Sequence, residues 1–350
     1  MTASFGFLRG FLRELVAEGV MSGVVGWAGS DRRTLWRDAA GEARSGSQRR
    51  PARVSTRFDY ASLTKPFAAT LALVLDRSGE LPLSVRVGEI FPDTCPALGR
   101  ATLESLLRHR SGLADWAPLY ALARRRDEAL AEILSGRFLG ARRGTYSDLG
   151  YILWGFACER VTGRPWQELL DARVLRPLGV ATVTGPQRDA PSIAECRCDN
   201  GKEVDLARRI GVKVAERRVV RSGVPQDGNA RFLGPATAHA GLFGDAAALM
   251  ELGREWLQPA RVLVPQQIER ALGGPRGPYA LGWARRRVRG TAGPAFDSSA
   301  FGHVGFTGGS LWIDPRRRLI CVLLGHRVDA RSDLRPWRRR FHELAVGQLT

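Results

Sequence analysis

The stretch FDYASLTKPF, residues 58 to 67, contains a serine, Ser62, three positions before a lysine, Lys65. That lysine is unusual, because 50 of the 53 Lys and Arg residues in the chain are arginine. Serine and lysine at positions i and i+3 of a helix lie on one face, one turn apart. A lysine can lose its proton and then accept one from a neighbouring hydroxyl, whereas an arginine stays charged. The spacing therefore indicates a serine nucleophile, Ser62, with Lys65 as its base.

A long apolar helix is predicted to follow this pair. Residues 66 to 81, PFAATLALVLDRSGEL, are mostly apolar, and Gly79 is a typical C-terminal stop. Pro66 suits the first turn, where a missing N–H costs little. The start of this helix would direct backbone N–H groups and the positive end of the helix dipole towards Ser62. No other Ser-x-x-Lys pair occurs in the chain, so this one is the candidate catalytic motif.

Short apolar segments near both ends of the chain have the composition and period of strands. Two lie near the N-terminus and four near the C-terminus: 22–29, 35–41, 280–290, 301–308, 310–315 and 319–326. Because no crossover helices separate the members of either group, we predict one antiparallel sheet closed by both termini. A last amphipathic helix is expected after Ser332, its predicted N-cap.

The predicted fold class is α+β, with an antiparallel sheet flanked by terminal helices. Residues 1–61 together with 275–350 form the predicted sheet domain. Residues 62–274 form a predicted, mainly helical domain inserted into it, with the active site between the two. Residues 185–235, rich in charge, Gly and Pro, are predicted to be a long loop or excursion.

The composition is that of a globular chain. It has 350 residues, of which 44% are hydrophobic, enough for a large core. No run of about 18 apolar residues is present, so no transmembrane helix and no membrane partner are predicted. The N-terminal stretch MTASFGFLRGFLRELVAEG lacks the apolar core and cleavage site of a signal peptide. These features favour a cytoplasmic location.

The five cysteines form no recognisable disulfide framework. Cys196 and Cys198, in ECRCD, raise the possibility of a metal site. No second cysteine pair and no close histidine pair accompanies them, so we interpret them as two loop thiols. We therefore predict no metal and no cofactor.

The formal net charge of +18 would suit a nucleic-acid-binding protein. The arginines, however, lie in short runs from one end of the chain to the other, without a basic tail or interleaved aromatic residues. A general preference for arginine explains this pattern more simply. The predicted partner is therefore a small-molecule substrate, with no specific nucleic acid.

Two further motifs follow the serine and lysine. Tyr146-Ser147-Asp148 stands in GTYSDLGYILWG before a predicted helix, and His303-Val304-Gly305 stands in FGHVGFTGGSLWIDP on a predicted strand. With these motifs the chain resembles the serine β-lactamase and penicillin-binding-protein superfamily, particularly its class C-like esterase and D,D-peptidase branch. The resemblance covers about residues 20 to 345 and implies the fold of that superfamily.

The resemblance implies a role for each matching residue. Ser62 would be the acylated nucleophile, and Lys65 its base or the proton relay to it. Tyr146 would exchange a proton with Ser62 and with the leaving group. The backbone N–H groups of Ser62 and Phe306 would form the oxyanion hole, and water would then release the acyl group.

The second motif departs from the family pattern at Asp148, where the family usually has asparagine. A carboxylate near Lys65 would raise the lysine pKa and favour the charged amine. Tyr146 would then be favoured as the base. Asp148 can instead cap the helix that follows it, or do both. Both readings stay open at this stage.

The third motif departs at His303, which replaces a lysine, and at Val304, which replaces a threonine. Together with Gly305 these residues would line the substrate site, but they weaken the anion pocket that β-lactams and D-alanyl peptides require. His303 can still donate one hydrogen bond, or it can simply pack. His239 can line the cleft, although a structural role is favoured.

The sequence therefore predicts a serine hydrolase that acts through an acyl-enzyme on a carboxylic ester or small amide. One alternative is a true β-lactamase or D,D-carboxypeptidase, against which the absent signal peptide and the His-Val-Gly motif argue. A second alternative is a non-catalytic descendant that binds a ligand. No Gly-x-Ser-x-Gly motif is present, which argues against an α/β-hydrolase.

Overall fold

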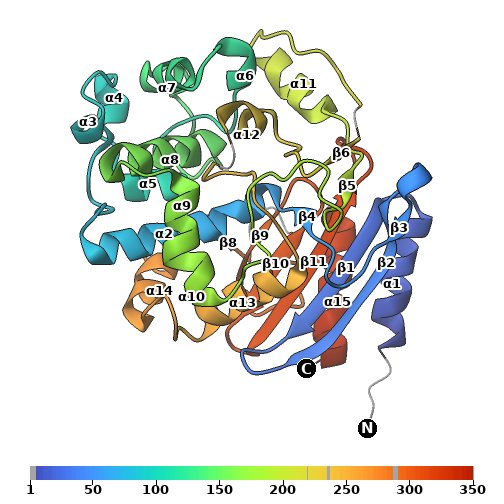
Figure 1. Ribbon diagram of the computed structural model, residues 1–350. Helices are drawn as coiled ribbons and strands as arrows, with labels where there is room; N and C mark the ends of the chain where they lie inside the picture. The colour runs from blue at the N-terminus through green and yellow to red at the C-terminus, as the bar shows by residue number, and fades with distance from the viewer. Residues whose placement is uncertain (1–4, 219, 235–236, 287–290, 350) are drawn as a thin grey trace.

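A computed structural model describes residues 5–218, 220–234, 237–286 and 291–349 (Figure 1). Its largest sheet has seven strands in the order β3-β2-β1-β11-β10-β9-β8. The strands are β1 (Met21–Gly29), β2 (Thr34–Arg44), β3 (Arg50–Pro51), β8 (Ala284–Arg285), β9 (Phe301–Val304), β10 (Ser310–Asp314) and β11 (Leu319–Arg327). Every neighbouring pair is antiparallel, and the N-terminal β1 pairs directly with the C-terminal β11. The predicted α+β class, with a sheet closed by both ends of the chain, is confirmed.

Successive residues of a strand face opposite sides of the sheet, so each side has its own apolar surface, and a layer of helices covers each one. Val24 packs with α1 (Gly6–Ala17) and α15 (Arg335–Leu349), and the ring centroids of Phe11 and Phe341 in those helices lie 6.2 Å apart. Its neighbour Val25 belongs to the larger core on the opposite side. There α13 (Ala246–Leu257) lies against the sheet (Figure 1).

The segment between the two groups of strands is mainly helical. Its helices include α2 (Thr64–Ser78), α3 (Val87–Ile90), α4 (Pro96–Gly99), α5 (Leu103–Leu107), α6 (Leu119–Leu122), α7 (Arg126–Leu134), α8 (Asp148–Thr162), α9 (Trp166–Leu170), α10 (Arg176–Leu178) and α14 (Pro265–Leu272). The predicted long helix is α2, and Gly79 ends it with a left-handed φ of 76°. The proposed boundaries at residues 61 and 275 remain predictions.

Three local predictions need correction. Residues 185–235 are not simply a loop, because they contain β5 (Glu195–Cys196), α11 (Gly201–Arg209), β6 (Arg221–Ser222) and α12 (Gly228–Leu233). The strand predicted at 280–290 is limited to β8, and residues 287–290 lie outside the described part of the chain. Helix α15 begins at Arg335, whose N–H donates to Asp333 at 2.9 Å, so Ser332 is not its cap.

Within the described residues, no helix combines the length and the apolar character needed to cross a bilayer.

Candidate active site

The predicted nucleophile, Ser62, lies in a short 3₁₀ turn, η2 (Ala61–Leu63), between β4 (Phe58–Asp59) and α2. The preceding residue, Ala61, has a φ of +46°, a conformation that costs free energy for any residue other than glycine. The buried carboxylate of Asp59 holds it there, because Asp59 Oδ1 accepts the Ala61 N–H at 2.8 Å. The turn thus presents Ser62 at the edge of a cleft of about 430 Å³.

Lys65 is fully buried beneath Ser62 and contacts three oxygen atoms. Its Nζ lies 3.0 Å from Ser62 Oγ, 2.8 Å from the backbone oxygen of His239 and 2.5 Å from Asp148 Oδ1. Burial lowers the pKa of the Lys65 amine and outweighs Asp148, which raises it. The predicted effect of Asp148 is therefore real but does not decide the direction of the shift.

Tyr146 lies on the other side of Ser62, and its hydroxyl donates to Ser62 Oγ at 2.8 Å. Burial, followed by the charge of Asp148, raises the pKa of Tyr146 well above its ordinary value, so the phenol keeps its proton at neutral pH. The ring of His109 packs against the Tyr146 ring, with 4.6 Å between the ring centroids. His109 was not among the predicted site residues. The structure shows that its backbone is constrained, with a positive φ of 54°.

Asp148 is the first residue of α8, but it is not the cap of that helix. The N-cap is Ser147, whose hydroxyl accepts the Gly150 N–H at 3.2 Å. The Asp148 carboxylate instead turns towards Lys65 and the cleft. The capping interpretation of Asp148 was therefore wrong, and the electrostatic one agrees with the geometry.

The third motif lies at the end of β9 and faces the same cleft. His303 and Val304 both line it, as do Gly305 and Phe306. The His303 Nδ1–H donates to the Val304 backbone oxygen at 3.0 Å, and burial lowers the His303 pKa to about 3. His303 is therefore neutral, and its other ring nitrogen is an acceptor, so the predicted hydrogen-bond donation to substrate is not supported.

A hydrogen bond links the two backbone segments that carry the predicted oxyanion donors, Ser62 and Phe306. Thr307, next to Phe306, donates its hydroxyl to the backbone oxygen of Asp59 at 2.7 Å. Within the described residues the Phe306 N–H has no hydrogen-bond acceptor, as expected of a donor kept for a ligand. Asp59 therefore contacts both backbone segments, through its carboxylate on one side and its carbonyl on the other.

The cleft also contains charges that sequence reasoning did not place there. Four cations line it: Lys202 and Arg209, on the same face of α11, and Arg327 and Arg338. Arg338 is buried and donates to the backbone oxygens of Gly305 and Gly308, at 2.7 and 3.3 Å. No local pattern links these cations to Ser62, because all four are far from it along the chain and α11 lies in the stretch predicted to be a loop.

No metal-binding group was found. Among the described residues no cluster of three or more His, Cys, Asp or Glu side chains could hold an ion. Cys196 lies in strand β5, and both it and Cys198 are buried free thiols whose pKa is raised by burial. Cys198 lies in a loop, as predicted, and both thiols pack in a small core beside Phe306.

Comparison with known proteins identifies the family. A family model described as Beta-lactamase matches residues 8–345. The chain is 27% identical over 322 residues to an N-acetylmuramyl-L-alanine amidase of Bacillus subtilis (strain 168), a match that covers 79% of this chain and 69% of the amidase. It is 26% identical over 311 residues to a protein of Escherichia coli (strain K12) named "Putative D-alanyl-D-alanine carboxypeptidase", covering 79% and 70% of the two chains.

The solved structures give the same fold. EstCE1, described as a hydrolase with promiscuous acyltransferase activity, is similar with a TM-score of 0.77 at 19% identity, covering 98% of this chain and 99% of EstCE1. The match to the family model over nearly the whole length agrees with the three motifs and with the fold that brings them together. The chain belongs to the Beta-lactamase family.

Proposed function

We propose that this chain is a serine hydrolase that acts on a carboxylic ester or small amide through an acyl-enzyme on Ser62. The observation that carries the proposal is the contact of one hydroxyl with two proton-handling groups: Ser62 Oγ lies 3.0 Å from Lys65 Nζ and 2.8 Å from the Tyr146 hydroxyl. A serine becomes a useful nucleophile only when a neighbouring base takes its proton. Burial favours the neutral amine that such a base requires.

The proposed reaction proceeds in two halves. Ser62 Oγ attacks the substrate carbonyl carbon while its proton passes to Lys65, and the carbonyl oxygen becomes an anion facing the N–H groups of Ser62 and Phe306. The tetrahedral intermediate then collapses, the bond to the leaving group breaks, and Tyr146 gives its proton to that group and recovers one from Lys65. Water attacks the acyl-enzyme by the reverse proton path and releases the acid. Oxyanion donors of this kind contribute about 3 kcal/mol each.

Several properties of the cleft support a neutral substrate. His303 is uncharged because burial lowers its pKa to about 3, and Val304 has no hydroxyl to bind a carboxylate. Of the four cations that line the cleft, Arg327 and Arg338 already donate to backbone oxygens, so a charged substrate would have to bind Lys202 or Arg209. The relative from Bacillus subtilis is an amidase, which supports keeping small amides in the proposal.

The first alternative, a β-lactamase or D,D-carboxypeptidase, is favoured by the relative from Escherichia coli and would require Lys202 or Arg209 to bind the substrate carboxylate. The second alternative is a non-catalytic, ligand-binding descendant. It would require that the contacts at Ser62 never activate the hydroxyl.

The test is intact mass spectrometry after incubation with a serine-directed fluorophosphonate. We expect one adduct per chain, located on Ser62 by peptide mapping, and none on Ser62→Ala. The same wild-type protein should hydrolyse p-nitrophenyl acetate with an initial burst. Folded protein that takes up no label, or takes it up on another serine, would refute the enzyme assignment.

A further inference from the structure

The hydrogen bonds around Lys65 determine where its lone pair points. A neutral amine has two N–H donors and one lone pair. The His239 carbonyl accepts a hydrogen bond from Nζ at 2.8 Å, and the Asp148 carboxylate forms an ion pair with Nζ at 2.5 Å; neither group has a proton to donate. If both N–H groups of the amine point to these acceptors, its lone pair must face the third neighbour, Ser62 Oγ. The position of the His239 carbonyl is therefore a condition for proton transfer from Ser62.

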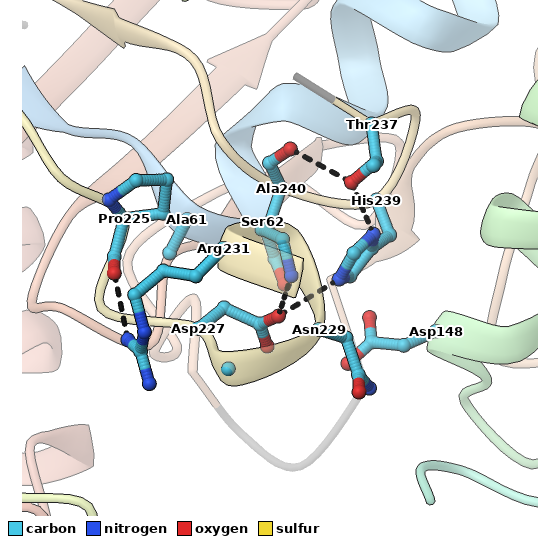
Figure 2. Close-up of polar contacts among 12 residues, drawn as sticks. Ala61, Ser62, Asp148, Pro225, Asp227, Asn229, Arg231, Thr237, His239 and Ala240 are labelled. Atoms are coloured by element: carbon cyan, nitrogen blue, oxygen red, sulfur yellow. Dashed lines mark hydrogen bonds and ion pairs between the residues drawn. The ribbon is translucent and has the colours of Figure 1, made fainter. Parts of the chain in front are cut away.

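The side chain of His239 anchors that carbonyl. The imidazole is fully buried and does not line the cleft, so the predicted structural position of this ring agrees with the geometry. Its Nε2 lies 3.0 Å from Asp227 Oδ1, and its Nδ1 lies 2.7 Å from the hydroxyl of Thr237 (Figure 2). Backbone hydrogen bonds between Thr237 and Ala240 close a tight turn around the residue. Both ring nitrogens are thus bound, which fixes the ring and the backbone that carries it.

Asp227 is itself held in place. It is the N-cap of α12, and its Oδ1 also accepts the Ala230 N–H at 2.7 Å. Burial by itself would raise the Asp227 pKa, but His239 and the hydrogen bonds lower it to about 2, so the carboxylate is charged at neutral pH. The neighbouring Gln226 donates its N–H to Asp59 at 2.7 Å, which ties this segment to the turn that carries Ser62.

We propose that Asp227 and His239 form a positioning pair for Lys65, in which Asp227 orients the imidazole and the imidazole holds the His239 carbonyl against the Lys65 amine. The inference rests on the proposed function, because it assigns these residues to the base of that reaction. Neither residue touches the substrate in this scheme. They act by restricting rotation of the amine, so their loss should lower kcat more than it raises KM.

The first test compares ester hydrolysis by matched variants. His239→Phe keeps the volume of the ring but removes both hydrogen bonds, and we expect kcat to fall about a hundredfold with little change in KM. His239→Gln retains an N–H that reaches Asp227 and should recover most of the loss. The control is His342→Phe, because His342 is an equally buried histidine on α15 outside the cleft. A kcat loss in His342→Phe as large as in His239→Phe, or no recovery in His239→Gln, would overturn the proposal.

The second test does not depend on catalysis and uses the scarcity of lysine. The chain has three lysines, so protein labelled with ¹³C-lysine gives three resolvable sets of signals, and Lys65→Arg identifies the one from Lys65. Among the described residues, the charged or titratable groups that face Lys65 are Asp148, Asp227, His109, His303, Tyr146 and Tyr151. His239→Phe removes the imidazole that anchors the backbone carbonyl against the ammonium, so that acceptor is held less firmly, and Asp227→Asn removes a negative charge. Both variants should therefore move the Lys65 titration to lower pH.

Lys213, which does not line the cleft, serves as the internal reference and should keep its signals in every variant. An unchanged Lys65 titration in both variants would overturn the positioning pair even if their thermal stability falls. Protein that shows the Lys65 shift but takes up no fluorophosphonate would refute the proposed hydrolase and leave the pair standing. The two failures are therefore distinguishable.

Discussion

The Nζ atom of Lys65 lies 2.5 Å from Asp148 Oδ1, and the pair spans the boundary between core and cleft. The Lys65 side chain has no exposed surface, whereas 15% of the Asp148 side chain is exposed. The carboxylate can therefore stabilise the ammonium formed when Ser62 loses its proton, while burial keeps the resting amine easy to deprotonate. Burial and Asp148 thus have opposite effects on the pKa of the Lys65 amine, so the amine can both accept and return a proton.

We predict that Asp148→Asn moves the acidic limb of the kcat/KM profile to lower pH. Asp148 raises the Lys65 pKa and burial lowers it, so removing the carboxylate leaves the downward effect alone and the free amine persists in more acidic solution. Ester hydrolysis between pH 5 and 9 measures the limb. Ser147→Ala is the control, because loss of the cap should cost about 1 kcal/mol of stability without moving the limb. A limb that stays in place in Asp148→Asn would contradict this assignment.

Lys65→Arg and Tyr146→Phe should separate the two proton-handling groups. Arginine stays protonated, so Lys65→Arg should lower kcat/KM by a factor on the order of a thousand or more. Tyr146→Phe removes one hydrogen bond to Ser62 and the predicted acid for the leaving group. Its effect should therefore be larger for an alkyl ester than for a p-nitrophenyl ester, whose leaving group needs no proton. Equal losses of kcat/KM on both substrates would contradict the role of Tyr146 as the acid for the leaving group.

The substrate prediction concerns charge. A carboxylate that enters the cleft loses water, which costs several kcal/mol unless protein groups replace it. We expect kcat/KM for p-nitrophenyl acetate or butyrate to be at least about tenfold above that for a chromogenic cephalosporin. Val304→Thr should narrow the gap by adding one hydroxyl donor. Equal or better cephalosporin turnover by the wild type would favour the β-lactamase alternative.

Titration of Asp59 should make the free energy of unfolding depend on pH. Burial raises the Asp59 pKa to about 6, so the folded state binds this proton more tightly than the unfolded chain does. The group therefore makes the fold less stable as pH rises from 5 to 7, by about 1 kcal/mol. Urea unfolding at the two values should show that Asp59→Asn lacks this decrease. The variant should also lose activity, because the two carboxylate oxygens accept the N–H groups of Ala61 and Gln226, whereas an asparagine amide has one acceptor oxygen.

Much of this organisation could be predicted from local pattern. The period-two segments predicted β1, β2, β9, β10 and β11, and Gly79 predicted the end of α2, because strand alternation and a left-handed helix stop depend on neighbours a few residues away. The i, i+3 spacing of Ser62 and Lys65 likewise placed two groups together within one turn. The order of the three motifs was enough to suggest the family.

What only the tertiary structure decided is the chemistry of each group. Sequence reasoning gave Asp148 a possible capping role that belongs to Ser147, because both residues suit a helix start and only packing selects between them. It left His303 as a possible donor, but the Val304 carbonyl occupies its N–H. Lys65 meets the carbonyl of His239 across 174 positions of the chain. Burial and long-range contacts determine the pKa and the hydrogen-bond partners of each of these side chains, and neither can be read from a short stretch of residues.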